Sequence, residues 1–295
     1  MTSGMHRSVS PLLLLLAASC SPLRTFNALV PKDPGVERIA QDQAYREGAR
    51  GRLDLYAPRK RAAGQLPIIV FFYGGSWNSG TKDGYGFVGR ALASRGFLVA
   101  IPDYRLVPKV RFPSFLEDGA AAVRWVRAHA ARYGGDPDRI VLAGHSAGAY
   151  NAAMLSFDPR WLGADRAAVR GFVGLAGPYD FLPLDQPASL AAFGAAPDLQ
   201  ATQPVRFVDA GDPPSLLLVA GRDTLVKPRN ARNLAAALRR SGVPAELRTY
   251  DGLGHIGILT ALSRLFRGKA PVLRDVADFA REVTAETPRA IAPAA

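Results

Sequence analysis

Short apolar, β-forming runs alternate along this chain with alanine-rich or amphipathic stretches. The apolar runs predict strands at 52–56, 68–73, 97–101, 139–143, 172–175, 215–220 and 247–250. The stretches between and after them predict helices at 85–95, 114–133, 147–157, 228–240 and 275–283. Strands that alternate with helices indicate an α/β fold, in which a mainly parallel, doubly wound sheet carries helices on both faces.

This alternation extends over residues 51–285, which we interpret as one domain. Residues 178–214 interrupt it, because they are rich in proline, alanine and glycine and have no clear strand pattern. We interpret this stretch as a short cap inserted over the sheet. Residues 20–50 are mixed and polar, which predicts an irregular tether, and residues 286–295 are predicted to form a frayed tail.

The charge of the chain is strongly basic, but its distribution does not resemble a nucleic-acid-binding surface. The formal net charge is +12, and only six of the 37 basic residues are lysines. The arginines are scattered along the sequence, whereas a nucleic-acid binder more often gathers basic residues on one face among aromatic ones. We therefore expect no nucleic-acid partner.

Residues 1–19 have the order of an export signal. His6 and Arg7 precede a short apolar run that ends at Ala18, and Ser19 and Cys20 follow. The ending LLAASC resembles a bacterial lipoprotein box, although Ala17 stands where leucine is commoner. Cleavage before Cys20 would leave the only cysteine of the chain at the new N-terminus, where it would be lipidated. We expect an exported protein tethered on the periplasmic side; the alternative is an ordinary cleaved signal with an incidental cysteine.

The sequence Gly144-His145-Ser146-Ala147-Gly148 stands between a predicted strand and a predicted helix. A G-x-S-x-G sequence in this context forms a sharp turn that lifts the serine hydroxyl above the sheet. The helix that follows points its N-terminus at that hydroxyl, which favours negative charge there. Ser146 is therefore the candidate nucleophile.

A serine nucleophile needs a base, and the chain has only four histidines, at positions 6, 129, 145 and 255. The first lies in the signal, the second lies in the middle of a predicted helix, and the third is adjacent to the serine. His255 remains, in a glycine-containing loop after the last predicted strand. Asp223, just after the strand at 215–220, is the favoured carboxylate, while Asp180 and Asp251 are rivals.

The strand at 68–73 ends at two glycines, in the sequence Tyr73-Gly74-Gly75-Ser76-Trp77. A Walker phosphate-binding motif is absent, and one cysteine with so few histidines disfavours a metal cluster. An oxyanion hole remains, in which the N–H groups of Gly75, Ser76 and Ala147 face a substrate oxygen. We expect neither a cofactor nor a metal.

These motifs together resemble the α/β-hydrolases of the esterase/lipase type, close to the bimodular feruloyl esterase-like, hormone-sensitive-lipase-like and kynurenine formamidase-like branches. The resemblance covers about residues 50–285. It is carried by YGGSW (73–77), DYRL (103–106), FPSFLED (112–118), GHSAG (144–148), PPSLLLVAGRDTLV (213–226) and GLGH (252–255). It implies a serine hydrolase that cleaves carboxylic esters through an acyl-enzyme, without a cofactor.

One position departs from this resemblance. The loop normally reads H-G-G-x-W, and Tyr73 replaces its histidine here. Prolyl-oligopeptidase-like hydrolases resemble Y-G-G and use the tyrosine hydroxyl as an oxyanion donor. Two roles therefore stay open for Tyr73, as a donor in the oxyanion hole or as a brace of the loop.

The predicted function is a carboxylesterase that acts on a small-molecule ester through Ser146, Asp223 and His255. Amide hydrolysis, as in an arylformamidase or a peptidase, would use the same groups. A different class of function, a non-catalytic binding protein on this scaffold, would more readily have lost one of the three residues, and all three are present.

Overall fold

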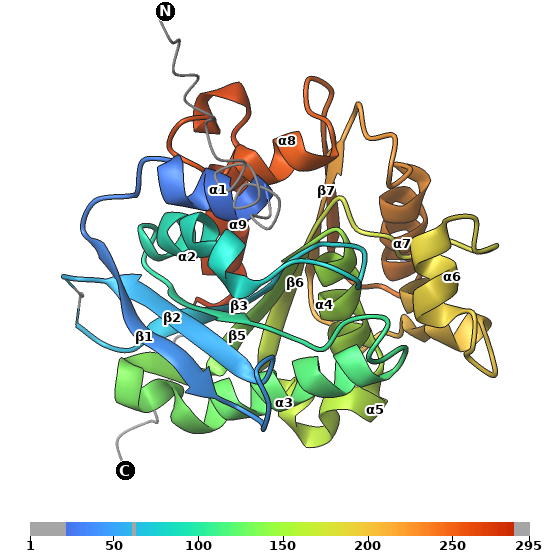
Figure 1. The fold of residues 1–295 in the computed structure, drawn as a ribbon, viewed down its shortest axis with the longest axis horizontal. Helices are drawn as coiled ribbons and strands as arrows, with labels where there is room; N and C mark the ends of the chain where they lie inside the picture. The colour runs from blue at the N-terminus through green and yellow to red at the C-terminus, as the bar shows by residue number, and fades with distance from the viewer. Residues whose placement is uncertain (1–21, 61–62, 286–295) are drawn as a thin grey trace, which may run out of the picture.

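A computed structural model describes residues 22–60 and 63–285 (Figure 1). The predicted signal at 1–19, Cys20 and the predicted tail at 286–295 lie outside the described residues. The core is one eight-stranded sheet with the order β1-β2-β4-β3-β5-β6-β7-β8. Its strands are β1 (Val36–Ala44), β2 (Arg52–Pro58), β3 (Leu66–Phe72), β4 (Leu98–Pro102), β5 (Gly135–His145), β6 (Val169–Leu175), β7 (Ser215–Ala220) and β8 (Ala245–Tyr250).

The sheet is parallel from β4 to β8, and β1 and β2 join it in antiparallel pairing. This confirms the predicted α/β fold with a mainly parallel sheet. The helices are α1 (Pro22–Leu29), α2 (Gly86–Ala93), α3 (Ser114–His129), α4 (Ala147–Phe157), α5 (Pro159–Leu162), α6 (Pro187–Phe193), α7 (Arg229–Arg240), α8 (His255–Thr260) and α9 (Val272–Val283).

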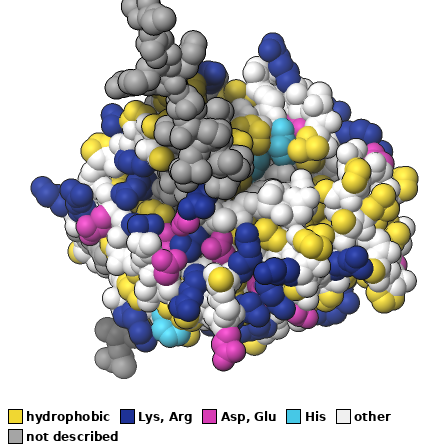
Figure 2. Space-filling model, viewed as in Figure 1, with side chains coloured by type: hydrophobic (Ala, Val, Ile, Leu, Met, Phe, Trp, Pro, Cys, Tyr) yellow, Lys and Arg dark blue, Asp and Glu magenta, His cyan; other side chains and the backbone are white. Residues whose placement is uncertain are grey.

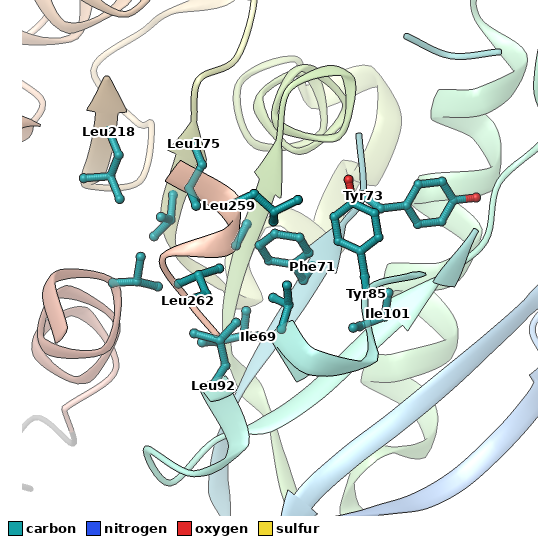
Figure 3. Close-up of a cluster of buried hydrophobic side chains, with 14 of the residues drawn as sticks. Ile69, Phe71, Tyr73, Tyr85, Leu92, Ile101, Leu175, Leu218, Leu259 and Leu262 are labelled. Carbon is teal, nitrogen blue, oxygen red and sulfur yellow. The ribbon is translucent and has the colours of Figure 1, made fainter. Parts of the chain in front are cut away.

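The two faces of the sheet are buried by different helices, because successive side chains of a strand point to opposite faces. Ile69 and Phe71 of β3 pack with residues of α2, α8 and α9 (Figure 3). Ile68 and Val70 of the same strand pack with residues of α3, α4 and α7. Burial on both faces explains why the central strands are continuous apolar runs in the sequence.

The expectation of an irregular tether over residues 20–50 is wrong for much of its length. This stretch contains α1 and the nine-residue strand β1, which pairs with β2 at the edge of the sheet. Val36 is the only fully buried residue of β1, so the strand is attached through backbone hydrogen bonds rather than an apolar face. None of the residues of α1 is fully buried. Neither element therefore has the apolar pattern by which the others are recognised.

Residues 178–214 connect β6 to β7 and contain α6 and two short 3₁₀ turns, with no strand. Their interpretation as a cap over the sheet stays a prediction. Basic side chains are spread over the face of the molecule shown in Figure 2, with acidic ones among them. No helix in the described part of the chain is long and apolar enough to cross a membrane.

Candidate active site

Ser146 occupies a strained turn between β5 and α4. Its backbone has φ 55° and ψ −126°, which is rare for a residue with a side chain. The chain is crowded on both sides: a Cβ at Gly148 would lie 2.1 Å from the carbonyl oxygen of Phe72, and one at Gly144 would lie 2.3 Å from that of Gly148. Only glycine fits these two positions, and the result is a serine held at the carboxyl end of a central strand.

Ser146, Asp223 and His255 come together at this edge of the sheet from three separate segments. Asp223 follows β7, and His255 is the first residue of α8, after β8. His255 Nε2 lies 2.8 Å from Ser146 Oγ, and His255 Nδ1 lies 2.7 Å from Asp223 Oδ2. The serine hydroxyl can therefore pass its proton to an imidazole that a carboxylate holds in orientation.

The carboxylate of Asp223 is fixed as an acceptor. Its Oδ1 accepts hydrogen bonds of 2.9 Å from the backbone N–H groups of Leu225 and Val226. Burial alone would raise the pKa of Asp223, but the hydrogen bonds from His255 and these two amides outweigh it and hold the pKa below its usual value. The group is therefore an anion at neutral pH, as required to stabilise a protonated His255.

The two rival carboxylates have other surroundings. Asp180 accepts a 2.6 Å hydrogen bond from the side-chain amide of Asn233, and its backbone N–H donates to Asn230. For Asp251, the structure shows neither a hydrogen bond nor an ion pair with His255, whose Nδ1 is bonded to Asp223. The structure thus brings Asp223, and not its rivals, to the imidazole.

His145, which sequence reasoning sets aside as the base, supports the turn instead. Its Nε2 lies 2.9 Å from the backbone carbonyl oxygen of His255, so the N–H donates to that carbonyl and links β5 to α8. The ring is buried, and its Nδ1 has no hydrogen-bond partner among the described residues. Burial, and then the proximity of His255, lower the pKa of His145 to about 3. His129 lies far away on α3, stacked on Trp125.

The loop after β3 faces Ser146 and also adopts strained backbone conformations. Gly75 has φ 133°, while Ser76 and Trp77, which carry side chains, have φ 50° and 58°. The backbone N–H groups of Gly75 and Ser76 make no hydrogen bond to any other described residue. Ala147, immediately after Ser146, begins α4, so its N–H belongs to the unpaired first turn of that helix. These three amides are the ones the sequence predicts for an oxyanion hole.

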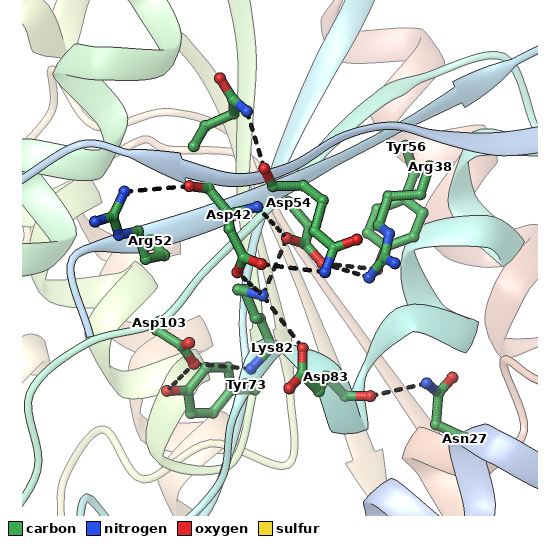
Figure 4. A network of polar contacts seen from close by, with 12 residues as sticks. Asn27, Arg38, Asp42, Arg52, Asp54, Tyr56, Tyr73, Lys82, Asp83 and Asp103 are labelled. Atoms are coloured by element: carbon green, nitrogen blue, oxygen red, sulfur yellow. Dashed lines mark hydrogen bonds and ion pairs between the residues drawn. The ribbon is translucent and has the colours of Figure 1, made fainter. Parts of the chain in front are cut away.

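The hydroxyl of Tyr73 belongs to the support of this loop (Figure 4). It donates a 2.9 Å hydrogen bond to Asp103 Oδ1 and accepts a 3.1 Å hydrogen bond from Arg50. Arg50 also donates to the carbonyl oxygen of Gly80, at the end of the loop. The Tyr73 side chain is fully buried and lines neither cavity at Ser146. Of the two roles left open, the structure therefore favours the brace over the direct donor.

Lys82, in the short 3₁₀ turn that follows this loop, is a buried cation that belongs to the same hydrogen-bond network. Lys82 Nζ contacts carboxylate oxygens of Asp42, Asp54 and Asp83 at 2.6, 3.1 and 3.2 Å. Burial would lower the pKa of Lys82, but the three carboxylates raise it above its usual value, so the ammonium stays charged. Its backbone N–H donates to Asp103, the acceptor of the Tyr73 hydroxyl (Figure 4).

Two cavities meet at Ser146. The first, of about 360 Å³, lies under the cap, and its wall includes Trp77, Phe181 and residues 185–189. The second, of about 550 Å³, lies on the side of His255, and its wall includes Leu23 and Phe26 of α1. Ser76, Ser146 and Leu225 contribute to both walls.

The sequence pattern does not identify α1 as part of the site. It offers one weak signal: Leu23 and Phe26 are three residues apart, the spacing that places two apolar side chains on one face of a helix. Phe181, in the predicted cap, lies on the wall of the first cavity. Among the described residues no group of three or more His, Cys, Asp or Glu side chains could hold a metal ion.

The parallel sheet, the strand–serine–helix turn and the hydrogen-bonded Ser146–His255–Asp223 series define the protein as an α/β-hydrolase of the esterase/lipase type. More narrowly, the chain belongs to the BD-FAE family, whose model matches residues 53–238. The match begins at the start of β2, so α1 and β1 lie outside it.

Several relatives of this chain carry esterase names. A probable isoprenylcysteine alpha-carbonyl methylesterase of Oryza sativa is 32% identical over 245 residues, which cover 74% of this chain and 57% of the relative. Esterase LipC of Mycobacterium tuberculosis is 29% identical over 210 residues, which cover 63% of this chain and 52% of LipC. The chain thus spans little more than half the length of these relatives.

Solved structures share the fold over most of this chain. Apo esterase 2 of Thermogutta terrifontis is 25% identical, with a TM-score of 0.69, covering 88% of this chain and 98% of the esterase. A truncated carbohydrate esterase from gut microbiota is 21% identical, with a TM-score of 0.74, covering 87% of this chain and all of that one.

Proposed function

We propose that this protein is a serine carboxylesterase that hydrolyses small-molecule carboxylic esters through an acyl-enzyme. The observation that carries the proposal is a pair of hydrogen bonds made by His255. Its Nδ1 lies 2.7 Å from Asp223 Oδ2, and its Nε2 lies 2.8 Å from Ser146 Oγ. The esterase names of the relatives support the same class of reaction.

The reaction begins when Ser146 Oγ attacks the ester carbonyl carbon while its proton moves to His255 Nε2. The carbonyl oxygen becomes an oxyanion, which the N–H groups of Gly75, Ser76 and Ala147 stabilise; one such donor typically contributes about 10²–10³ in rate. The bond from carbon to the alcohol oxygen then breaks, and His255 gives its proton to that oxygen. Water, deprotonated by His255, attacks the acyl-enzyme, releases the acid and restores the Ser146 hydroxyl.

A fluorophosphonate probe tests this assignment, because it phosphonylates an activated serine. We expect labelling of the wild-type protein at Ser146 and none of Ser146→Ala, with hydrolysis of p-nitrophenyl acetate lowered by about 10⁴-fold or more. The matched control is Ser94→Ala, which removes an exposed serine at the end of α2. Labelling that persists in Ser146→Ala, or a wild-type protein that does not react, would refute the proposal.

Amide hydrolysis would use the same groups, so substrate comparison must separate the two. We expect p-nitrophenyl acetate to be cleaved at least about tenfold faster than N-formylkynurenine or an aminoacyl p-nitroanilide at equal concentration. A preference for either amide would reassign the enzyme within the same mechanism.

We further propose that the protein is exported and anchored through a lipid on Cys20. The apolar run before Cys20 and the lone cysteine support this, and α1 begins only two residues beyond it. Mass spectrometry of the mature N-terminus, after expression in a bacterium that lipidates exported proteins, should find a diacylglyceryl cysteine. An unmodified Cys20 at the mature terminus would refute the anchor.

A further inference from the structure

The second cavity at Ser146 has no role in the reaction as described so far. Its volume is about 550 Å³. Its wall includes residues of α1, the loop after β3 and α8, together with Tyr85, the serine turn and Leu225. Leu23 and Phe26 supply the apolar part from α1, and Ile256, half exposed, supplies it from α8. A cavity of this size, open at the nucleophile, is large enough for one portion of an ester.

We propose that this cavity is the subsite for the alcohol portion of the ester, that α1 forms its outer wall, and that its ligand is an apolar alkyl or aryl alcohol. The proposal rests on the proposed esterase function and deepens it. It assigns the cap-side cavity to the acyl portion.

The position of His255 separates the two cavities. When the ester bond breaks, the alcohol oxygen must take its proton from His255 Nε2, so the alcohol portion lies on the imidazole side of the serine. His255, Ile256 and Thr260 contribute to the wall of the second cavity, and none of them contributes to the first. The first cavity instead has Ala147, Trp77 and the cap around it.

The wall formed by α1 is held in place by aromatic packing. The Phe26 ring meets Phe87 of α2 edge to face at 5.1 Å and stacks on Phe266, beyond α8, at 6.1 Å. The side-chain amide of Asn27 donates a 2.8 Å hydrogen bond to the carbonyl oxygen of Asp83. These contacts hold α1 in position although none of its residues is fully buried. The side chain of Leu23 therefore has a fixed place on the cavity wall.

The test varies the alcohol and acyl portions of the ester separately in the full-length protein. One series keeps the acetyl group and changes the alcohol from ethyl to hexyl and benzyl, followed by acid release in a pH-stat. The other keeps p-nitrophenol and changes the acyl group from acetyl to butyryl and octanoyl. Each result is a ratio of kcat/KM values from one preparation, so a partly unfolded variant does not distort it.

Leu23→Trp narrows the second cavity and Leu23→Ala widens it. We expect Leu23→Trp to lower the hexyl-to-ethyl ratio by about tenfold and Leu23→Ala to raise it or leave it unchanged, with the acyl ratios constant in both. Phe181→Ala, on the wall of the first cavity, should move the acyl ratios and not the alcohol ratio. The control Leu29→Ala removes a side chain that is 79% exposed on the same helix and should move neither.

The possible results distinguish an error in the subsite assignment from an error in the proposed esterase function. If the wild type hydrolyses these esters but Leu23→Trp leaves the alcohol ratio unchanged, the subsite assignment is wrong while the esterase stands. A shift in the acyl ratios alone would also refute the assignment, because it would place the acyl portion beside α1. A wild type that hydrolyses none of these esters would refute both the function and the subsite.

Discussion

Two turns face each other across the candidate active site, and they are held in strained conformations by different means. The turn around Ser146 and the loop after β3 both hold residues with side chains at positive φ: 55° at Ser146, 50° at Ser76 and 58° at Trp77. Each such residue costs about 1–3 kcal/mol of free energy relative to a relaxed backbone. The surrounding structure must supply that energy in each case.

The serine turn is held by close packing of backbone on backbone. Gly148 of α4 rests against the carbonyl oxygen of Phe72 at the end of β3, and Gly144 rests against Gly148. The amide of Ser146 also donates a 2.9 Å hydrogen bond to the carbonyl oxygen of Leu175 on β6. The glycines that allow this packing lie within five consecutive residues.

The loop after β3 is held by polar side chains that come from elsewhere in the chain. The hydroxyl of Tyr85 accepts a 3.1 Å hydrogen bond from the amide of Gly74, and the hydroxyl of Tyr104 donates a 2.7 Å hydrogen bond to the carbonyl oxygen of Tyr73. Arg50 and Asp103 hold Tyr73 itself. An added atom in the close-packed serine turn would clash with backbone that cannot move aside. Loss of one hydrogen bond in the loop after β3 would leave the other hydrogen bonds in place. We therefore expect substitutions in the serine turn to abolish its structure and substitutions in the loop after β3 to weaken it only in part.

The largest effect should follow Gly148→Ala. A Cβ there would lie 2.1 Å from the carbonyl oxygen of Phe72 and 2.4 Å from that of Tyr73, and both are backbone atoms of the adjoining strand and loop, which cannot rotate away. We expect the free energy of unfolding to fall by about 4 kcal/mol or more, measured by urea denaturation, with loss of esterase activity.

The matched control for this substitution is Gly268→Ala. Gly268 has no positive φ, and a Cβ there would meet nothing within 4 Å. Its free energy of unfolding should change by no more than about 0.5 kcal/mol. A Gly148→Ala protein with stability close to that of this control would show that the turn can relax, and that packing does not hold it.

The difference between the two turns also explains what the sequence could predict. Ser146 and its glycines form a contiguous motif with a recognisable strand before it and helix after it, so the turn is readable from the sequence alone. The supports of the loop are not contiguous: Asp103 is 30 residues from Tyr73, and Arg50 is 23. Only the three-dimensional pairing shows that the Tyr73 hydroxyl is engaged in this network, which is why sequence reasoning left two roles open.

The same reasoning applies to the fold. The seven predicted strands all lie in the sheet. Burial on both faces gives the central ones their apolar pattern, whereas β8, at the edge, is only partly buried. The sequence pattern does not reveal strand β1, which lies at the edge of the sheet, or helix α1, which buries little of its own surface. Both elements precede residue 53, where the family match begins. The wall of the proposed alcohol subsite thus comes from a part of the chain that neither periodicity nor the family model describes.

An intermediate effect should follow His145→Gln in the serine turn, and it should depend on pH. In the folded protein His145 is buried and its pKa is about 3, against about 6.5 for an exposed histidine. Between these values the unfolded state binds a proton that the folded state does not, so stability falls as the pH falls below about 6.5. At pH 5 the loss attributable to this group is about 2 kcal/mol.

Glutamine cannot titrate, and its amide can still donate to the carbonyl oxygen of His255. We expect the free energy of unfolding, measured by urea denaturation, to fall between pH 7 and pH 5 in both proteins. The fall should be about 2 kcal/mol smaller in His145→Gln than in the wild type. His129→Gln, which removes a half-buried imidazole from α3, controls for the loss of a histidine elsewhere. Equal pH slopes for the wild type and His145→Gln would mean that His145 is protonated or accessible in the folded state.

The smallest effect should follow Tyr73→Phe, which removes one member of the network that braces the loop. Asp103 would keep its 2.8 Å hydrogen bond from the Lys82 amide, and Arg50 would keep the carbonyl oxygens of Gly80 and Tyr104, so the loop loses only part of its support. We expect the free energy of unfolding to fall by about 1 kcal/mol and kcat for p-nitrophenyl acetate to fall by less than about tenfold.

Tyr250→Phe is a suitable control for Tyr73→Phe, because it removes a 2.7 Å hydrogen bond to Asp275. It should cost similar stability and leave kcat unchanged. A loss of about 10²-fold or more in kcat for Tyr73→Phe, at the stability of this control, would make the hydroxyl a direct donor to the oxyanion. The hydroxyl would then have to leave Asp103 during the reaction, and the loop after β3 would be a moving part rather than a fixed one. The contrast between the two turns would then be one of mobility, with the serine fixed by packing and the oxyanion hole completed only when substrate is bound.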